Sequence, residues 1–251
     1  MTTTDTVDDV EDPKLTQRLF GVGPSDVWHT VIKVVGLMAA IYALETWSYF
    51  AVAEYFGGLW GLDQTHNFQT AIDRVTPWCT PLYAIYIPWP FLWYFAIPLV
   101  ILGATGKRGY SRYTVNAMLM YVIGSVIYAL FPTTTTPADF INGRFDTLPD
   151  GALFHDSLVS LSQSHANIWG SFPSYHNYWA ALFIFFALTP GVKARWRYPM
   201  LALGALISLS TLTLHQHCVL DVVLTYAMTA LFLALTRWFH WDDKLLAWFE
   251  R

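Results

Sequence analysis

The chain has 251 residues, of which 55% are hydrophobic, 17% are aromatic and only 13% are charged. A soluble domain normally carries about 25% charged residues, so this composition excludes an ordinary soluble enzyme and favours a polytopic membrane protein. The formal net charge of −4 gives no reason to expect a nucleic-acid partner. The two cysteines, Cys79 and Cys218, have no metal-ligand spacing and build no disulfide framework.

Residues 1–12 are polar and acidic, without the pattern of a cleavable signal peptide, and we expect residues 1–26 to form a cytoplasmic tail. Residues 27–240 are predicted to form one all-α catalytic domain, a bundle of six transmembrane helices, because a crossing needs about 20 apolar residues. Residues 241–251, WDDKLLAWFER, form an amphipathic tail that we expect at the membrane interface. The predicted spans cover residues 31–56, 83–102, 113–131, 173–191, 198–214 and 219–239.

Lysine and arginine give the orientation of this bundle. In a six-span model, 12 of the 14 basic residues lie on the side of the two termini, and only Arg74 and Arg144 lie on the other side. The positive-inside rule then places both termini in the cytoplasm. The long loops 57–85 and 132–171 face outward, and the links 103–112 and 192–197 face the cytoplasm.

The first span contains an ionisable residue, Glu45. A carboxyl group is costly in lipid, so we expect it to face the interior of the bundle. An interhelical hydrogen bond is favoured over a catalytic role.

The sequence HQHCVLD, residues 215–221, opens the last span. His217 and Asp221 are four residues apart and share one face wherever the helix has begun. The carboxylate can then hold the ring Nδ1–H and leave Nε2 with an exposed lone pair, which makes the imidazole a nucleophile. Alone, this spacing fits a structural histidine–aspartate pair better than an active site.

The sequence SFPSYH, residues 171–176, opens the fourth span. Serine and proline at this position predict a helix start, whose free N–H groups can bind an anion such as phosphate. Ser174 adds a hydroxyl donor, and His176 is placed to protonate a leaving oxygen. Both histidine motifs fall on the predicted outer side, so we expect His176, His217 and Asp221 to meet there.

FPSYH followed by a span and then LHQHCVLD resembles the type-2 phosphatidic-acid phosphatase superfamily, and most closely its branch near the inositol phosphorylceramide synthases. The resemblance implies that His217 takes the phosphoryl group and that Asp221 orients it. It also implies that His176 is the general acid and base, that Ser174 contacts the phosphate, and that the reaction needs no metal or other cofactor. The two motifs cover about fifty residues, and DRVTPW, residues 73–78, is a weaker similarity.

The sequence departs from that family at the cations that contact phosphate. The first family motif, a lysine followed seven residues later by Arg-Pro, is absent, and Thr211 stands where the phosphatases have arginine. A transferring phosphoryl group still needs positive charge around it. The candidates are Arg144, then Arg74, with His215 as a third; local pairing of the arginines with Asp146 and Asp73 is an equally good explanation.

The resulting prediction is a lipid phosphatase of a bacterial plasma membrane, with an active site facing away from the cytoplasm. The same residues would serve a phosphotransferase that moves a phospho-headgroup onto a lipid alcohol. A proton-relay transporter would need ionisable residues through the depth of several spans, and only Glu45 and Lys33 come close. A homologue that binds lipid without turnover remains an alternative because the first motif is absent. Nothing in the sequence gives the oligomeric state.

Overall fold

The computed structural model describes residues 27–61, 65–87, 92–134, 148–149, 151–162 and 170–251, and it is mostly helical. Within these described residues, three helical runs are long and apolar enough to cross a membrane: Trp28–Trp60, Tyr94–Leu130 and Val219–Phe239. Large apolar side chains are exposed along these runs, among them Ile32, Val126 and Val223. Such side chains favour contact with lipid, and the chain is a helical membrane protein.

The first run consists of α2 (Val27–Thr46), a π-helical stretch η1 (Trp47–Ala53) and α3 (Glu54–Trp60). It is longer at both ends than the predicted span 31–56. Gly61, with a φ of 74°, ends it, because a residue without Cβ enters this conformation at no steric cost. The predicted loop at 57–85 therefore begins later than expected.

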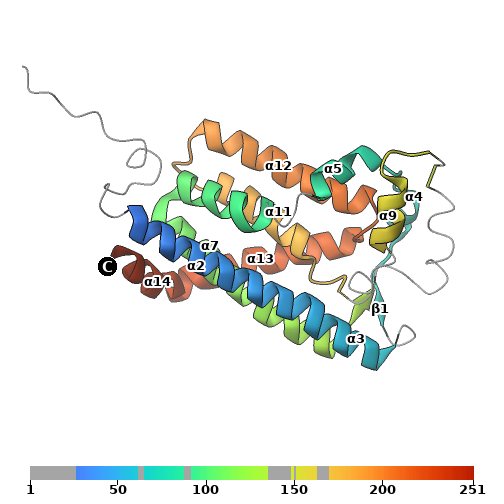
Figure 1. The fold of residues 1–251 in the computed structure, drawn as a ribbon, viewed down its shortest axis with the longest axis horizontal. Coiled ribbons are helices and arrows are strands. Elements are labelled where there is room, and N and C mark those ends of the chain that lie inside the picture. The colour runs from blue at the N-terminus through green and yellow to red at the C-terminus, as the bar shows by residue number, and fades with distance from the viewer. Residues whose placement is uncertain (1–26, 62–64, 88–91, 135–147, 150, 163–169) are drawn as a thin grey trace, which may run out of the picture.

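The second run contains η4 (Leu92–Ala96) and α7 (Ile97–Leu130). Helical geometry is interrupted once in α7, at Gly106, where φ is 69° and ψ is −172°. The predicted link 103–112 is therefore helical on both sides of this glycine. Figure 1 shows the chain changing direction within α7, from a green segment to a yellow-green one.

Three further helices complete the bundle: α11 (Tyr175–Ala187), α12 (Ala194–Thr213) and α13 (Val219–Phe239). The bounds of α13 coincide with the predicted last span. With 13 residues, α11 is shorter than the predicted fourth span. It packs closely on α12, where a Cβ at Gly204 would lie 2.9 Å from the carbonyl oxygen of Ala180.

The bundle has two distinct ends in Figure 1. We call one the terminal end, because it holds the start of α2 and the C-terminal helix α14 (Trp241–Glu250). The other, the loop end, holds the short elements β1 (His66–Asn67), α4 (Ala71–Val75), η3 (Thr80–Leu82), α5 (Tyr83–Tyr86), β2 (Thr133–Thr134) and α9 (His155–Ser162).

Two of these short elements are strands, which the all-α prediction did not include. The strands β1 and β2 pair in parallel, with His66 opposite Thr133, and Thr133 also forms a bridge with Gly170. Helix α9 lies inside the segment 132–171, which was predicted to be a loop. The pairing brings a part of the first long loop next to both ends of the second, beside the SFPSYH motif.

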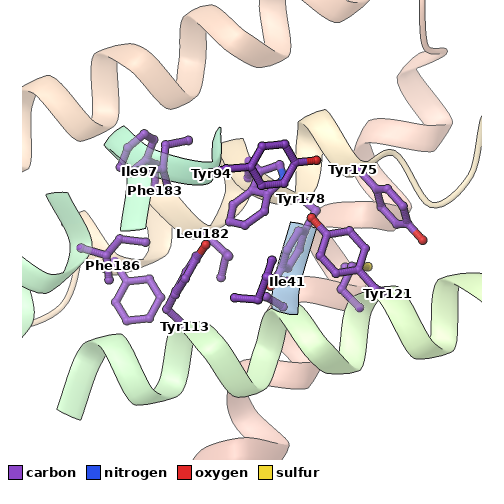
Figure 2. Packing of buried hydrophobic residues seen from close by; sticks show 14 of the residues in the cluster. Ile41, Tyr94, Ile97, Tyr113, Tyr121, Tyr175, Tyr178, Leu182, Phe183 and Phe186 are labelled. Carbon is purple, nitrogen blue, oxygen red and sulfur yellow. The ribbon is translucent and has the colours of Figure 1, made fainter. Parts of the chain in front are cut away.

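The core is unusually aromatic. Tyr113, Tyr121 and Tyr178 are buried between the helices with Phe183 and Ile41, as Figure 2 shows. Rings that carry a hydroxyl require polar partners when they are buried.

Glu45 supplies one of these partners, since the hydroxyl of Tyr121 donates a hydrogen bond to its Oε2. Glu45 is buried in the interior of the bundle. The predicted interhelical hydrogen bond is therefore confirmed.

The C-terminal helix α14 packs against the bundle at the terminal end. Its Asp242 is buried, 2.9 Å from Nε of Arg112, and Phe249 lies edge-on to Tyr110 with ring centroids 5.5 Å apart. The apolar face of the amphipathic tail is thus covered by α7. Residues 1–26 lie outside the described part of the chain.

Candidate functional site

The two histidines singled out in the sequence lie side by side at the loop end. The ring centroids of His176, on the first turn of α11, and His217, just before α13, are 5.8 Å apart. The segment between them folds back on itself, as α11 and α12 run in opposite directions along the bundle (Figure 1). One phosphate-sized anion could reach both rings.

The main chain before α13 fixes the position of His217. Its backbone N–H and that of Gln216 both donate to the carbonyl oxygen of Thr211, at 3.2 and 2.9 Å. The turn uses a left-handed residue, His215, with a φ of 52°. His217, which follows this turn, is only 8% exposed.

The tautomer of His217 follows from its hydrogen bond. Its Nδ1 lies 3.0 Å from the carbonyl oxygen of Ser171. A carbonyl can only accept, so Nδ1 carries a hydrogen, and in the neutral ring Nε2 then keeps its lone pair. This is the state that a nucleophilic imidazole requires.

Asp221 does not make the hydrogen bond that the sequence predicts for it. Its Oδ2 is 3.7 Å from Nδ1 of His217, beyond hydrogen-bond distance. Instead it accepts from the backbone N–H of Cys218, at 3.0 Å, and from the hydroxyl of Ser171. Asp221 is the third residue of α13, where a carboxylate folds back onto the helix start as a capping box. Its effect on the imidazole is therefore electrostatic.

Ser174 is the N-cap of α11, so the helix begins after Pro173 and not at it, as the predicted fourth span did. Its Oγ accepts from the backbone N–H of Asn177, at 3.2 Å, and from the Asn177 side chain, at 2.9 Å. The residue is fully buried. The contact of Ser174 with a phosphate stays a prediction.

Thr211 belongs to the same polar network. Its Oγ1 accepts from Nδ2 of Asn177, at 3.0 Å. A neutral network joining α11 to α12 thus occupies the position at which the similar phosphatases have arginine. Asn177 follows the motif histidine directly, yet neither charge nor spacing marked it in the sequence.

His176 is held by an aromatic ring that the sequence did not single out. Its imidazole stacks on Tyr86 of α5, with ring centroids 4.5 Å apart and planes 19° from parallel. Tyr86 belongs to a small hydrophobic cluster at the loop end, with Tyr83, Leu148, Leu158 and Leu214. Stacking of this kind restricts the rotation of the acid–base candidate.

Comparison with known proteins agrees with this geometry. A family model described as the PAP2 superfamily matches residues 56–235, well over half of the chain. The chain belongs to the PAP2 superfamily. Its members are generally phosphatases, which supports a phosphatase or phosphotransferase type of activity. No curated protein and no solved structure matches the chain.

Of the three candidate phosphate-binding cations in this PAP2 protein, the structure describes two, Arg74 and His215. Arg74 lies exposed on α4, and it forms no ion pair with Asp73 in the described part of the chain. The ring of His215 contacts Trp78, with centroids 4.4 Å apart. Arg144 lies outside the described residues. Among the described residues no three His, Cys, Asp or Glu side chains gather as metal ligands would, and metal independence stays a prediction.

Asp73 does not pair with its neighbour Arg74 but binds the start of α13. Its Oδ1 accepts from the backbone N–H of Val219, the first residue of α13, at 2.7 Å, and its Oδ2 accepts from Thr70, on the hydroxyl at 2.7 Å. A carboxylate at a helix N-terminus satisfies free N–H groups and the helix dipole. In this PAP2 protein Asp73 therefore joins the outer loop to the helix that follows His217.

Replacing Asp73 with alanine should destabilise the protein by about 1–2 kcal/mol, the usual cost of a lost helix cap. The Thr70→Ala variant is the matched control, because it removes the local contact within α4 and leaves the bond to Val219 intact. We expect a clearly larger fall in melting temperature for Asp73→Ala in detergent. Equal falls for the two variants would show that the bond to α13 contributes nothing.

Proposed function

We propose that this PAP2 superfamily member is a lipid phosphatase that works through a phosphohistidine at His217. The observation that carries the proposal is the pair of imidazoles, 5.8 Å apart, one of which keeps its Nε2 lone pair because Nδ1–H donates to a carbonyl. An imidazole in that tautomer can attack phosphorus, and a second one in reach can move the proton.

The reaction has two steps. Nε2 of His217 attacks the phosphorus, the bond from phosphorus to the lipid oxygen breaks, and His176 gives its proton to that oxygen. Water then attacks the phosphoryl group while His176 accepts a proton from it, the P–N bond breaks, and inorganic phosphate leaves. The negative charge of Asp221, 3.7 Å from Nδ1, stabilises the cationic ring of the intermediate.

A lipid alcohol in place of water would make the same site a phosphotransferase. The branch near the inositol phosphorylceramide synthases is compatible with the family match. Water is the acceptor we propose, because phosphatases are the general activity of the superfamily.

We further propose that the bundle crosses the membrane six times, with both termini in the cytoplasm. Two observations support this. Gly106, with a positive φ, divides the 37 residues of the second apolar run into two helical segments, and α12 runs opposite to α11 and α13 in Figure 1. The loop end, and with it the active site, would then face away from the cytoplasm in a bacterial plasma membrane. Labelling of single cysteines from either side of sealed vesicles, one at Trp60 and one at Glu250, tests this: labelling of both from the same side contradicts it.

The phosphate would be held by Arg74, Arg144, His215 and the hydroxyl of Ser174. Positive charge near the transferring group is worth most in the transition state.

Purified protein in detergent with a series of lipid phosphates tests the proposed reaction. We expect release of inorganic phosphate without added metal, and a fall in kcat/KM of at least about tenfold when either Arg74 or Arg144 is replaced by alanine. The Arg195→Ala variant, at the terminal end, is the control. Transfer of the phospho-headgroup to an added lipid alcohol without phosphate release would identify a transferase; neither product with any lipid would contradict both.

A further inference from the structure

Ser171 precedes the FPS turn, and each of its three polar groups forms a hydrogen bond in or beside the candidate site. Its carbonyl accepts from Nδ1 of His217, at 3.0 Å, and its hydroxyl donates to Oδ2 of Asp221. Its N–H donates to the carbonyl oxygen of Thr133, at 3.2 Å. Ser171 is only 2% exposed, so water does not compete for these bonds.

Asp221 depends on this serine for its position. Oδ2 has one other donor, the backbone N–H of Cys218, while Oδ1 is buried with no hydrogen-bond partner in the described part of the chain. Without the hydroxyl of Ser171, the carboxylate would be held by a single donor and could rotate. Its distance of 3.7 Å from Nδ1 of His217 would then no longer be fixed.

Ser171 is itself held by the strand β2. Oγ1 of Thr133 accepts from the N–H of Phe172, at 2.6 Å, and donates to its carbonyl oxygen, at 3.3 Å. Thr133 is fully buried and bridges to Gly170 as well. The segment that begins the outer loop is thus the support on which Ser171 rests.

We propose that Ser171 is the positioning residue of this active site. Its carbonyl orients the ring of His217 and selects the tautomer, and its hydroxyl holds Asp221 at the distance at which the carboxylate acts through its charge. The ring is therefore oriented by Ser171, and the carboxylate acts on it through its charge only while Ser171 holds it in place. This inference rests on the proposed function, in which His217 is the nucleophile.

A double-mutant cycle on turnover tests it, with Ser171→Ala, Asp221→Asn and both together. We expect Ser171→Ala to lower kcat about ten- to a hundredfold, as for a lost hydrogen bond to a charged group, and to leave KM within about twofold. The double variant should be no slower than Asp221→Asn, because both act through one interaction. An unchanged kcat in Ser171→Ala, or losses that multiply, would overturn the proposal.

The control is Ser111→Ala, a buried serine of α7 that donates to the carbonyl oxygen of Lys107, at 2.9 Å. It should keep full activity. If the unaltered protein turns over no lipid phosphate, the proposed function fails, and the same cycle is read from melting temperatures. Coupled losses of stability for Ser171 and Asp221 then support the hydrogen bond, and additive losses overturn it.

Discussion

The His217→Ala variant is expected to lose turnover of lipid phosphate by at least about ten-thousandfold, because the account gives it no other nucleophile. The ring makes one hydrogen bond through Nδ1, to the carbonyl of Ser171. Removal of the His217 side chain should therefore leave the fold intact, with a melting temperature close to that of the unaltered protein. Phosphate release and thermal melting of the same preparation give both results.

A neighbouring histidine supplies the control for this variant. His215 lies in the same turn, two residues earlier, with its ring against Trp78. The His215→Ala variant should lower kcat/KM far less than His217→Ala does, since its proposed role is to bind the phosphate and not to attack it. Full activity in His217→Ala would refute the mechanism.

Replacing His176 should have the second largest effect, and its size should depend on the leaving group. The alkoxide of a lipid is a poor leaving group, so loss of the general acid should lower kcat/KM about a hundred- to ten-thousandfold in His176→Gln. An aryl phosphate with an acidic phenol leaves without protonation. For that substrate we expect a much smaller fall in kcat/KM in His176→Gln, because the first step no longer needs the acid.

The comparison of the two substrates separates chemistry from structure. A ring that only filled the space beside Tyr86, at 4.5 Å, would affect both substrates alike. The Tyr86→Leu variant removes the stacked ring and keeps the imidazole. Its kcat/KM for the lipid phosphate should lie between those of the unaltered protein and of His176→Gln. Equal losses for both substrates in His176→Gln would contradict its role as the acid.

The parts of the fold that could be predicted are those coded by local patterns. The last span was predicted with the bounds of α13 because residues 219–239 are mostly apolar, with charged residues only near the two ends, Asp221 and Arg237. The helix start within SFPSYH follows from its serine and proline, although the cap is Ser174 and the helix begins one residue later. The proximity of the two histidines followed from the count of spans between them.

What could not be predicted depends on contacts between distant segments. Asp221 was expected to bind the ring of His217, but its place on the first turn of α13 and the hydroxyl of Ser171, fifty residues earlier, compete for it. The strands β1 and β2 have two residues each, too short to show a period of two. Helical structure around Gly106 was missed because glycines and charges there indicate a loop.

The central claim is that His217 carries the phosphoryl group during turnover. The protein should be mixed with a lipid phosphate, quenched at alkaline pH, where a phosphohistidine survives, and mapped by peptide mass spectrometry. The account predicts one phosphoryl group on the imidazole of His217, absent from the His217→Ala variant and accumulating in a variant slow in the hydrolytic step. Phosphate release that continues with the phosphoryl group on another residue, or with no phosphorylated intermediate under any of these conditions, would contradict it.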